Sequence, residues 1–156
     1  MTINTDSSVQ YHFDGESLYN AIEMRDIHVI SDILAECPDL VTKPYDFTEF
    51  TRYDLVCDYC EKYPLYHAWS VAYDTYSDSP LEIVNILLPY SDIFETNNQV
   101  QNLLHVAAFT GEFEIAKYAI LNGVCVNDID VNGNIPIQYT INNYTICDLI
   151  YKNRDW

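Results

Sequence analysis

Two segments that each begin a short helix lie 33 residues apart, and this spacing constrains the fold more than any other feature of the chain. The first segment, LLHVAA, starts at Leu103, and the second, PIQYTI, starts at Pro136. A fixed period of roughly 20 to 50 residues is the signature of a repeat protein, in which each unit buries its apolar face against its neighbours. The chain is therefore predicted to be a row of similar helical units.

The unit that begins at Leu103 shows how two helices fit inside one period. Leu104, Ala107 and Ala108 are spaced at i, i+3 and i+4, so they share one helix face, and the two alanines let a second helix approach closely. Gly111 supplies the turn, after which residues 113–120 have the apolar spacing of that second helix. The positions predicted to be among the most buried are Leu104, Ala107, Ala108, Ile115 and Ala119.

The segment GVCVNDIDVNGNIPI connects this unit to the next. Gly123 can end a helix in the left-handed conformation, and the pair Asn132-Gly133 accepts the positive φ of a tight turn. Pro136 suits the first position of a helix, where a missing N–H has no consequence. Position for position, the segment resembles the finger between ankyrin repeats, and the chain therefore resembles an ankyrin-repeat protein. The resemblance implies an all-α solenoid of stacked helix–turn–helix units with short finger turns.

The resemblance also implies a single ankyrin-repeat domain over residues 1–156, with repeats at about 14–45, 46–97, 98–130 and 131–156. The second repeat is irregular, with insertions in the Pro44–Tyr63 connection and between its two helices, in AYDTYSDS. The fourth is truncated, and Ile137 and Ile141 are expected to begin it. The Thr-Pro-Leu-His helix start of the family survives only in pieces, as His105 and Pro136, which puts hydrogen bonding between units through those side chains in doubt.

The charge of the chain is strongly negative and unevenly distributed. The net charge is −17, and residues 1–96 hold 18 acidic against 4 basic residues, whereas residues 97–156 hold 6 against 3. Direct binding to nucleic acid or to a membrane of anionic lipid is not expected, because both depend on Lys and Arg that neutralise phosphate. A basic protein partner is predicted instead. The alternative is that the charge only keeps the protein soluble.

Aromatic and acidic side chains alternate between Pro44 and Pro80, and this segment is predicted to bind the partner. Tyrosine buries a large area at low entropic cost, and neighbouring carboxylates can pair with Arg or Lys across an interface. The predicted partner-binding residues are Tyr45, Asp46, Glu49, Tyr53, Asp54, Asp58, Tyr59, Glu61, Tyr63, Tyr73, Asp74, Tyr76 and Asp78. The alternative is that many of these rings pack the irregular repeat onto its neighbours. Charge reversal at Asp128 and Asp130, in the other half, is expected to have little effect on partner binding.

Other chemistry is weakly indicated. Cys57, Cys60 and His67 have part of a zinc spacing, but a structural zinc site needs four ligands, so no metal and no cofactor are predicted. His105 stands at the helix start of its repeat, where a structural hydrogen bond is expected rather than catalysis. No catalytic residues are predicted. The five cysteines, with no secretory signal and no apolar run of membrane-spanning length, indicate reduced thiols in a cytoplasmic protein.

Three classes of function follow from these observations. The first is a non-enzymatic module that inhibits a basic protein acting on nucleic acid, either as an immunity protein against a toxin or as an anti-defence protein that presents DNA-like charge. Small acidic ankyrin-type proteins are known partners of bacterial toxins, so the resemblance permits this function. The alternative is an adaptor or host-directed effector whose acidity is incidental. An enzyme is the third class, and no constellation of residues favours it.

Overall fold

The computed structural model describes residues 12–47, 61–73 and 81–154, and all regular structure within these ranges is helical. The predicted all-α class is confirmed. None of the described helices is long and apolar enough to cross a membrane. The α-helices are α1 (Gly15–Glu23), α2 (Ile27–Glu36), α3 (Pro64–Tyr73), α4 (Glu82–Leu87), α5 (Leu103–Thr110), α6 (Phe113–Leu121) and α7 (Tyr144–Lys152), and the 3₁₀ turns are η1 (Pro38–Thr42), η3 (Leu88–Tyr90) and η4 (Pro136–Tyr139).

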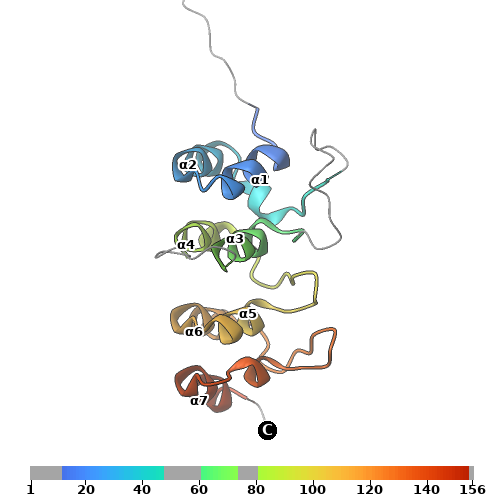
Figure 1. The fold of residues 1–156 in the computed structure, drawn as a ribbon, viewed down its shortest axis with the longest axis vertical. Coiled ribbons are helices and arrows are strands. Elements are labelled where there is room, and N and C mark those ends of the chain that lie inside the picture. The colour runs from blue at the N-terminus through green and yellow to red at the C-terminus, as the bar shows by residue number, and fades with distance from the viewer. Residues whose placement is uncertain (1–11, 48–60, 74–80, 155–156) are drawn as a thin grey trace, which may run out of the picture.

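The helices form antiparallel pairs that stack in a single row (Figure 1). The pairs are α1 with α2, α3 with α4, and α5 with α6. In the last unit the 3₁₀ turn η4 lies beside α7, in the position that α1, α3 and α5 have in the other units. The described parts of the connecting loops project to one side of the row (Figure 1). The backbones of α1 and α3 approach closely, as do those of α5 and η4, whereas α3 and α5 lie farther apart.

The helix faces predicted from the sequence form a continuous core along this row. The five positions predicted to be most buried are all buried: Leu104, Ala107, Ala108, Ile115 and Ala119. Gly111 and Gly123 both have the positive φ that their turns require. In the first unit Arg25 occupies the corresponding turn at φ 55°, and Asp26 caps α2 by accepting a hydrogen bond from the Val29 N–H.

The last unit departs from the expectation that Ile137 and Ile141 begin a helix. The chain forms only the 3₁₀ turn η4 and then reverses through Asn142, which has φ 65°, into the N-cap of α7 at Asn143. Ile141 lies in this reversal and is 79% exposed. The expectation for Ile141 is wrong because too few residues separate Pro136 from α7 for a full helix.

His105 joins the third and fourth units, in contrast to the doubt raised by the incomplete family motif. Its Nε2–H donates to the carbonyl of Asn134 (3.0 Å), while Nδ1 accepts from the N–H of Asn102 (3.2 Å). Asn102 caps α5 by accepting from the His105 N–H, and its amide donates to the carbonyl of Cys125 (3.0 Å). Asn102 is therefore the second partner in this link.

Asp130 organises the finger between these units. Its carboxylate accepts hydrogen bonds from the N–H groups of Asn132 (2.9 Å) and Asn134 (3.0 Å) and from the Tyr139 hydroxyl, and its side chain is almost completely buried. The Tyr139 hydrogen bond in particular lowers the pKa of Asp130 to about 2. Replacement by Lys would break all of these bonds, so charge reversal at Asp130 would disturb the finger itself, and its effect on partner binding stays a prediction.

Candidate functional site

Five of the thirteen predicted partner-binding residues lie within the described part of the chain, and they do not share one environment. These are Tyr45, Asp46, Glu61, Tyr63 and Tyr73. The rest lie outside the described residues and remain predictions: Glu49, Tyr53, Asp54, Asp58, Tyr59, Asp74, Tyr76 and Asp78. Cys57 and Cys60 also lie outside, and no group of three potential metal ligands occurs in the part that the structure describes.

Tyr45 is buried and forms part of a polar and aromatic cluster between the first two units. Its ring packs edge-on against Tyr19, with 5.3 Å between ring centroids, and only 7% of the residue is exposed. Burial raises the pKa of the Tyr45 hydroxyl far above its ordinary value. The ring of Tyr45 therefore packs the second unit onto the first, as the alternative interpretation of the aromatic residues held. Asp46, the next residue, is exposed.

His67 lies at the centre of the same cluster. The imidazole Nε2 is 2.7 Å from Glu23 Oε1, Nδ1 is 3.1 Å from the Tyr45 hydroxyl, and the ring stacks on Tyr19 at 4.2 Å. One neutral tautomer satisfies both bonds, with Nε2–H donating to the carboxylate and Nδ1 accepting from the hydroxyl. Burial lowers the pKa of His67 and outweighs the opposing effect of Glu23. The cluster holds α1, α3 and the connection between them together.

A cavity of about 180 Å³ opens between α3 and α5, and we refer to it as the α3–α5 groove. One face of each helix lines it, at helical spacing, and residues from the loops complete it. The lining residues are Tyr66, Trp69, Ser70 and Tyr73 of α3, Val106, Phe109 and Thr110 of α5, and Glu61, Asn97 and Gln101. Three of the four α3 residues that line the groove are aromatic.

Trp69 supplies the most unusual feature of the groove. The residue is only 3% exposed, and its indole stacks parallel to the Tyr73 ring, with 6.5 Å between ring centroids. The indole Nε1–H is buried and has no hydrogen-bond acceptor among the described residues. A buried donor without a partner is rare in proteins, because its lost hydration is not replaced.

Other aromatic and acidic groups lie in or next to the groove. Phe109 is 72% exposed although it lies on a largely buried helix. The Tyr73 hydroxyl donates a hydrogen bond to Glu112 Oε1 (2.9 Å). Burial, and to a lesser extent this carboxylate, raise the pKa of the Tyr73 hydroxyl to about 12. The groove therefore presents accessible ring surface beside negative charge.

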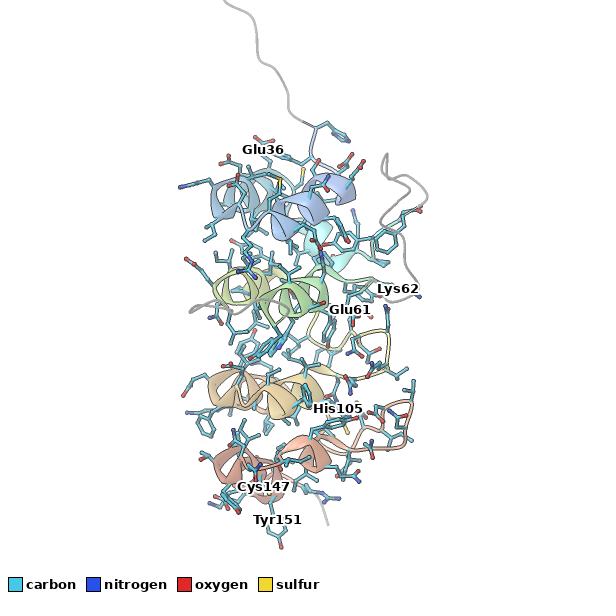
Figure 2. All side chains as sticks on the ribbon, viewed as in Figure 1. Glu36, Glu61, Lys62, His105, Cys147 and Tyr151 are labelled. Carbon is cyan, nitrogen blue, oxygen red and sulfur yellow. The ribbon has the colours of Figure 1, made fainter. Side chains whose placement is uncertain are left out.

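Glu61 lies at the loop side of the groove, directly before α3 (Figure 2). Its Oε2 accepts a hydrogen bond from the Asn98 N–H (3.1 Å), and partial burial raises the pKa of its carboxyl group. The residues that line the groove include no Lys, Arg or His. Tyr63 is half-buried nearby, and burial together with Glu95 raises the pKa of its hydroxyl.

Glu61 and Tyr73 were thus predicted as site residues and share one groove, whereas Trp69, Phe109 and Gln101 were not predicted. The sequence does carry a signal for Phe109, because it falls on the helix face opposite Leu104, Ala107 and Ala108. The sequence carries no comparable signal that the Trp69 indole lacks a hydrogen-bond acceptor. That property depends on the distance between two units.

None of the protein-family models and none of the curated proteins that were compared matches this chain. A function must therefore be argued from the geometry and charge of the described residues.

Proposed function

We propose that the protein is a non-enzymatic ankyrin-repeat module that binds a basic protein and thereby inhibits it. The stacked helix pairs, the left-handed glycines at the turns and the His105 bond to the Asn134 carbonyl support the ankyrin assignment. The predicted division into four repeats accords with the succession of helix pairs along the row. A partner that acts on nucleic acid, either a toxin or a defence protein, suits the DNA-like negative charge.

One observation carries the proposal of a basic partner: the α3–α5 groove combines exposed aromatic surface with the Glu61 carboxylate, and its lining has no basic side chain. In a chain with a net charge of −17, such a groove attracts cations and contacts them through ring faces. Complementary charge accelerates association and selects the partner more than it adds affinity. Occupation of the partner's nucleic-acid-binding surface would then block its activity.

A second candidate function is an adaptor or effector whose acidity is incidental. It is favoured by exposed apolar side chains on the loops that project from the row, namely Phe94, Val100, Ile129 and Val131. An interface formed by these side chains would depend on apolar area rather than on charge. The two functions therefore differ in how salt affects binding.

The partner can be isolated by affinity capture from native lysate and its association rate measured at increasing ionic strength. For a basic target we expect the rate to fall steeply as salt rises, because the Debye length shortens from about 10 Å at 0.1 M to about 3 Å at 1 M. The double variant Asp54→Lys, Asp58→Lys should slow association, whereas Glu114→Lys with Asp148→Lys changes the charge equally at exposed positions of the other half and should do so much less. A rate independent of salt would favour the adaptor.

Individual anchors can then be tested on the captured partner. Tyr53→Ala or Tyr59→Ala should weaken binding by about 2 kcal/mol each, the usual effect at an interface hot spot, with the helical circular dichroism spectrum unchanged. Tyr144→Ala is the control, because this exposed tyrosine belongs to the last unit and should leave the Kd unchanged. If only the Tyr144 variant weakens binding, the contact does not lie on the second unit.

A further inference from the structure

We propose that the α3–α5 groove binds an arginine of the partner within an extended peptide segment, with Trp69 Nε1–H donating to a backbone carbonyl of that segment. The inference rests on the proposed function and specifies the group that is recognised. It begins from the buried indole N–H, which has no acceptor among the described residues.

The indole determines one half of the ligand. An indole nitrogen can only donate a hydrogen bond, so the ligand must bring an acceptor into the groove. A peptide carbonyl is such an acceptor, and an extended chain exposes its carbonyl groups for bonding. The gain on binding is large for a group of this kind, because the N–H lost its hydration when the protein folded and recovers a partner only in the complex.

The aromatic and acidic lining determines the other half. Phe109 is largely exposed, the Tyr73 ring is accessible, and Glu61 lines the same cavity, whose lining residues include no Lys, Arg or His. A guanidinium group is planar, stacks on aromatic rings and pairs with a carboxylate through two parallel bonds. A lysine ammonium group offers neither the plane nor the paired donors, so arginine is the better occupant. The raised pKa of Glu61 accords with a carboxylate that gains from a cationic partner.

The test uses short capped peptides and the indole signal of Trp69 in nuclear magnetic resonance spectra. Trp156→Phe removes the second tryptophan, so that one indole N–H remains. The probe is acetyl-Gly-Arg-Gly-amide, and the matched controls carry Lys or Gln in place of Arg. We expect the arginine peptide to move the Trp69 Nε1–H signal downfield and to saturate. The lysine peptide should bind more weakly, and the glutamine peptide about tenfold more weakly than the arginine peptide, the effect of losing one charge-assisted contact.

Two variants separate the two halves of the ligand. Glu61→Gln should reduce the preference for Arg over Gln about fivefold to tenfold, whereas Trp69→Phe keeps an aromatic ring, removes the N–H and should weaken all three peptides alike, as observed from the chemical shifts of α3. Glu114→Gln, on an exposed turn of α6, should change neither.

Several results would overturn the inference. An indole signal that no peptide moves, or that the glutamine peptide moves as strongly as the arginine peptide, excludes recognition of the cation here. A signal that moves with protein concentration alone would show that a second copy of the chain occupies the groove. If the captured partner binds in a salt-dependent manner and Glu61→Gln and Trp69→Phe leave its Kd unchanged, the proposed function stands and the groove assignment fails. If the peptides bind as expected while no basic partner does, the groove stands and the inhibitor function fails.

Discussion

Arg25 holds the turn between α1 and α2 in a conformation that usually needs glycine. Its φ is 55°, and Gly111 has φ 82° in the equivalent turn of the third unit. A non-glycine residue in this region costs about 1 kcal/mol or more. The Arg25 guanidinium offsets that cost by donating to the carbonyl of Val71 (2.8 Å), which links the first unit to α3.

This balance gives a prediction at a single residue. Arg25→Ala loses the hydrogen bond and keeps the strain, so the free energy of unfolding should fall by about 1 to 2 kcal/mol. Arg25→Gly loses the bond but also the strain, and its loss should be about 1 kcal/mol smaller. Urea unfolding of the two variants and the parent measures both effects. A glycine variant less stable than the alanine variant would show that the turn is not strained.

Packing at Ala107 gives a second prediction at this scale. The residue is completely buried where α5 meets its neighbours, so Ala107→Leu should overpack the contact and lower the free energy of unfolding by about 1 to 3 kcal/mol. Ala35→Leu is the matched control, because Ala35 is exposed on α2 and the same enlargement there should cost little. Urea unfolding of both variants decides the matter. Equal stabilities for the two would mean that Ala107 does not lie in a close helix contact.

At the scale of elements, His67 connects helices α1 and α3, and its pKa makes the stability of that connection depend on pH. Burial lowers the folded-state pKa below the ordinary value of about 6.5, so the unfolded chain binds more protons between the two values. Neutral His67 contributes its full stability above a pH of about 6.5. This contribution is lost as the pH falls from about 6.5 through the lowered pKa of the folded state. His67→Gln should therefore unfold with a weaker dependence on pH between about 7.5 and 5.5 than the parent.

The control for this prediction is His28→Gln, because His28 is exposed on α2. Its free energy of unfolding should follow the pH dependence of the parent, whatever the acidic residues contribute to both. If the His67 and His28 variants show the same pH dependence, the imidazole of His67 is not held neutral in the folded protein.

The sequence predicted those elements that depend on local spacing. The buried face of α5 follows from i, i+3, i+4 periodicity, and the turns at Gly111 and Gly123 follow from the conformational freedom of glycine. The His67 cluster and the α3–α5 groove join residues more than twenty positions apart, and no periodicity relates them. Ile141 was mispredicted for a related reason, since the end of η4 depends on the reversal at Asn142 and not on apolar spacing.

At the scale of the whole molecule, the row of units carries its charge unevenly. Residues 1–96 hold 18 of the 24 acidic residues, and in a repeat protein each unit is stabilised mainly by its neighbours. Repulsion among like charges therefore weakens one end of the row more than the other. If the proposed basic partner binds there, it would relieve that repulsion where it is strongest, and binding and stability would then be coupled through the same charges.

Salt should reproduce part of the effect of such a partner. Raising sodium chloride from about 20 mM to about 0.5 M screens the repulsion, so the melting temperature should rise by about 3 °C or more, equivalent to about 1 kcal/mol for a chain of this length. Hydrogen exchange should locate the gain, with amide protection rising more in α1–α4 than in α5–α7. The less acidic end thus serves as an internal control, because any general effect of salt on burial acts on all the helices. An equal rise in protection along the whole row would show that the uneven charge does not determine where the molecule is weakest, and a fall in melting temperature would show that favourable ion pairs outweigh the repulsion.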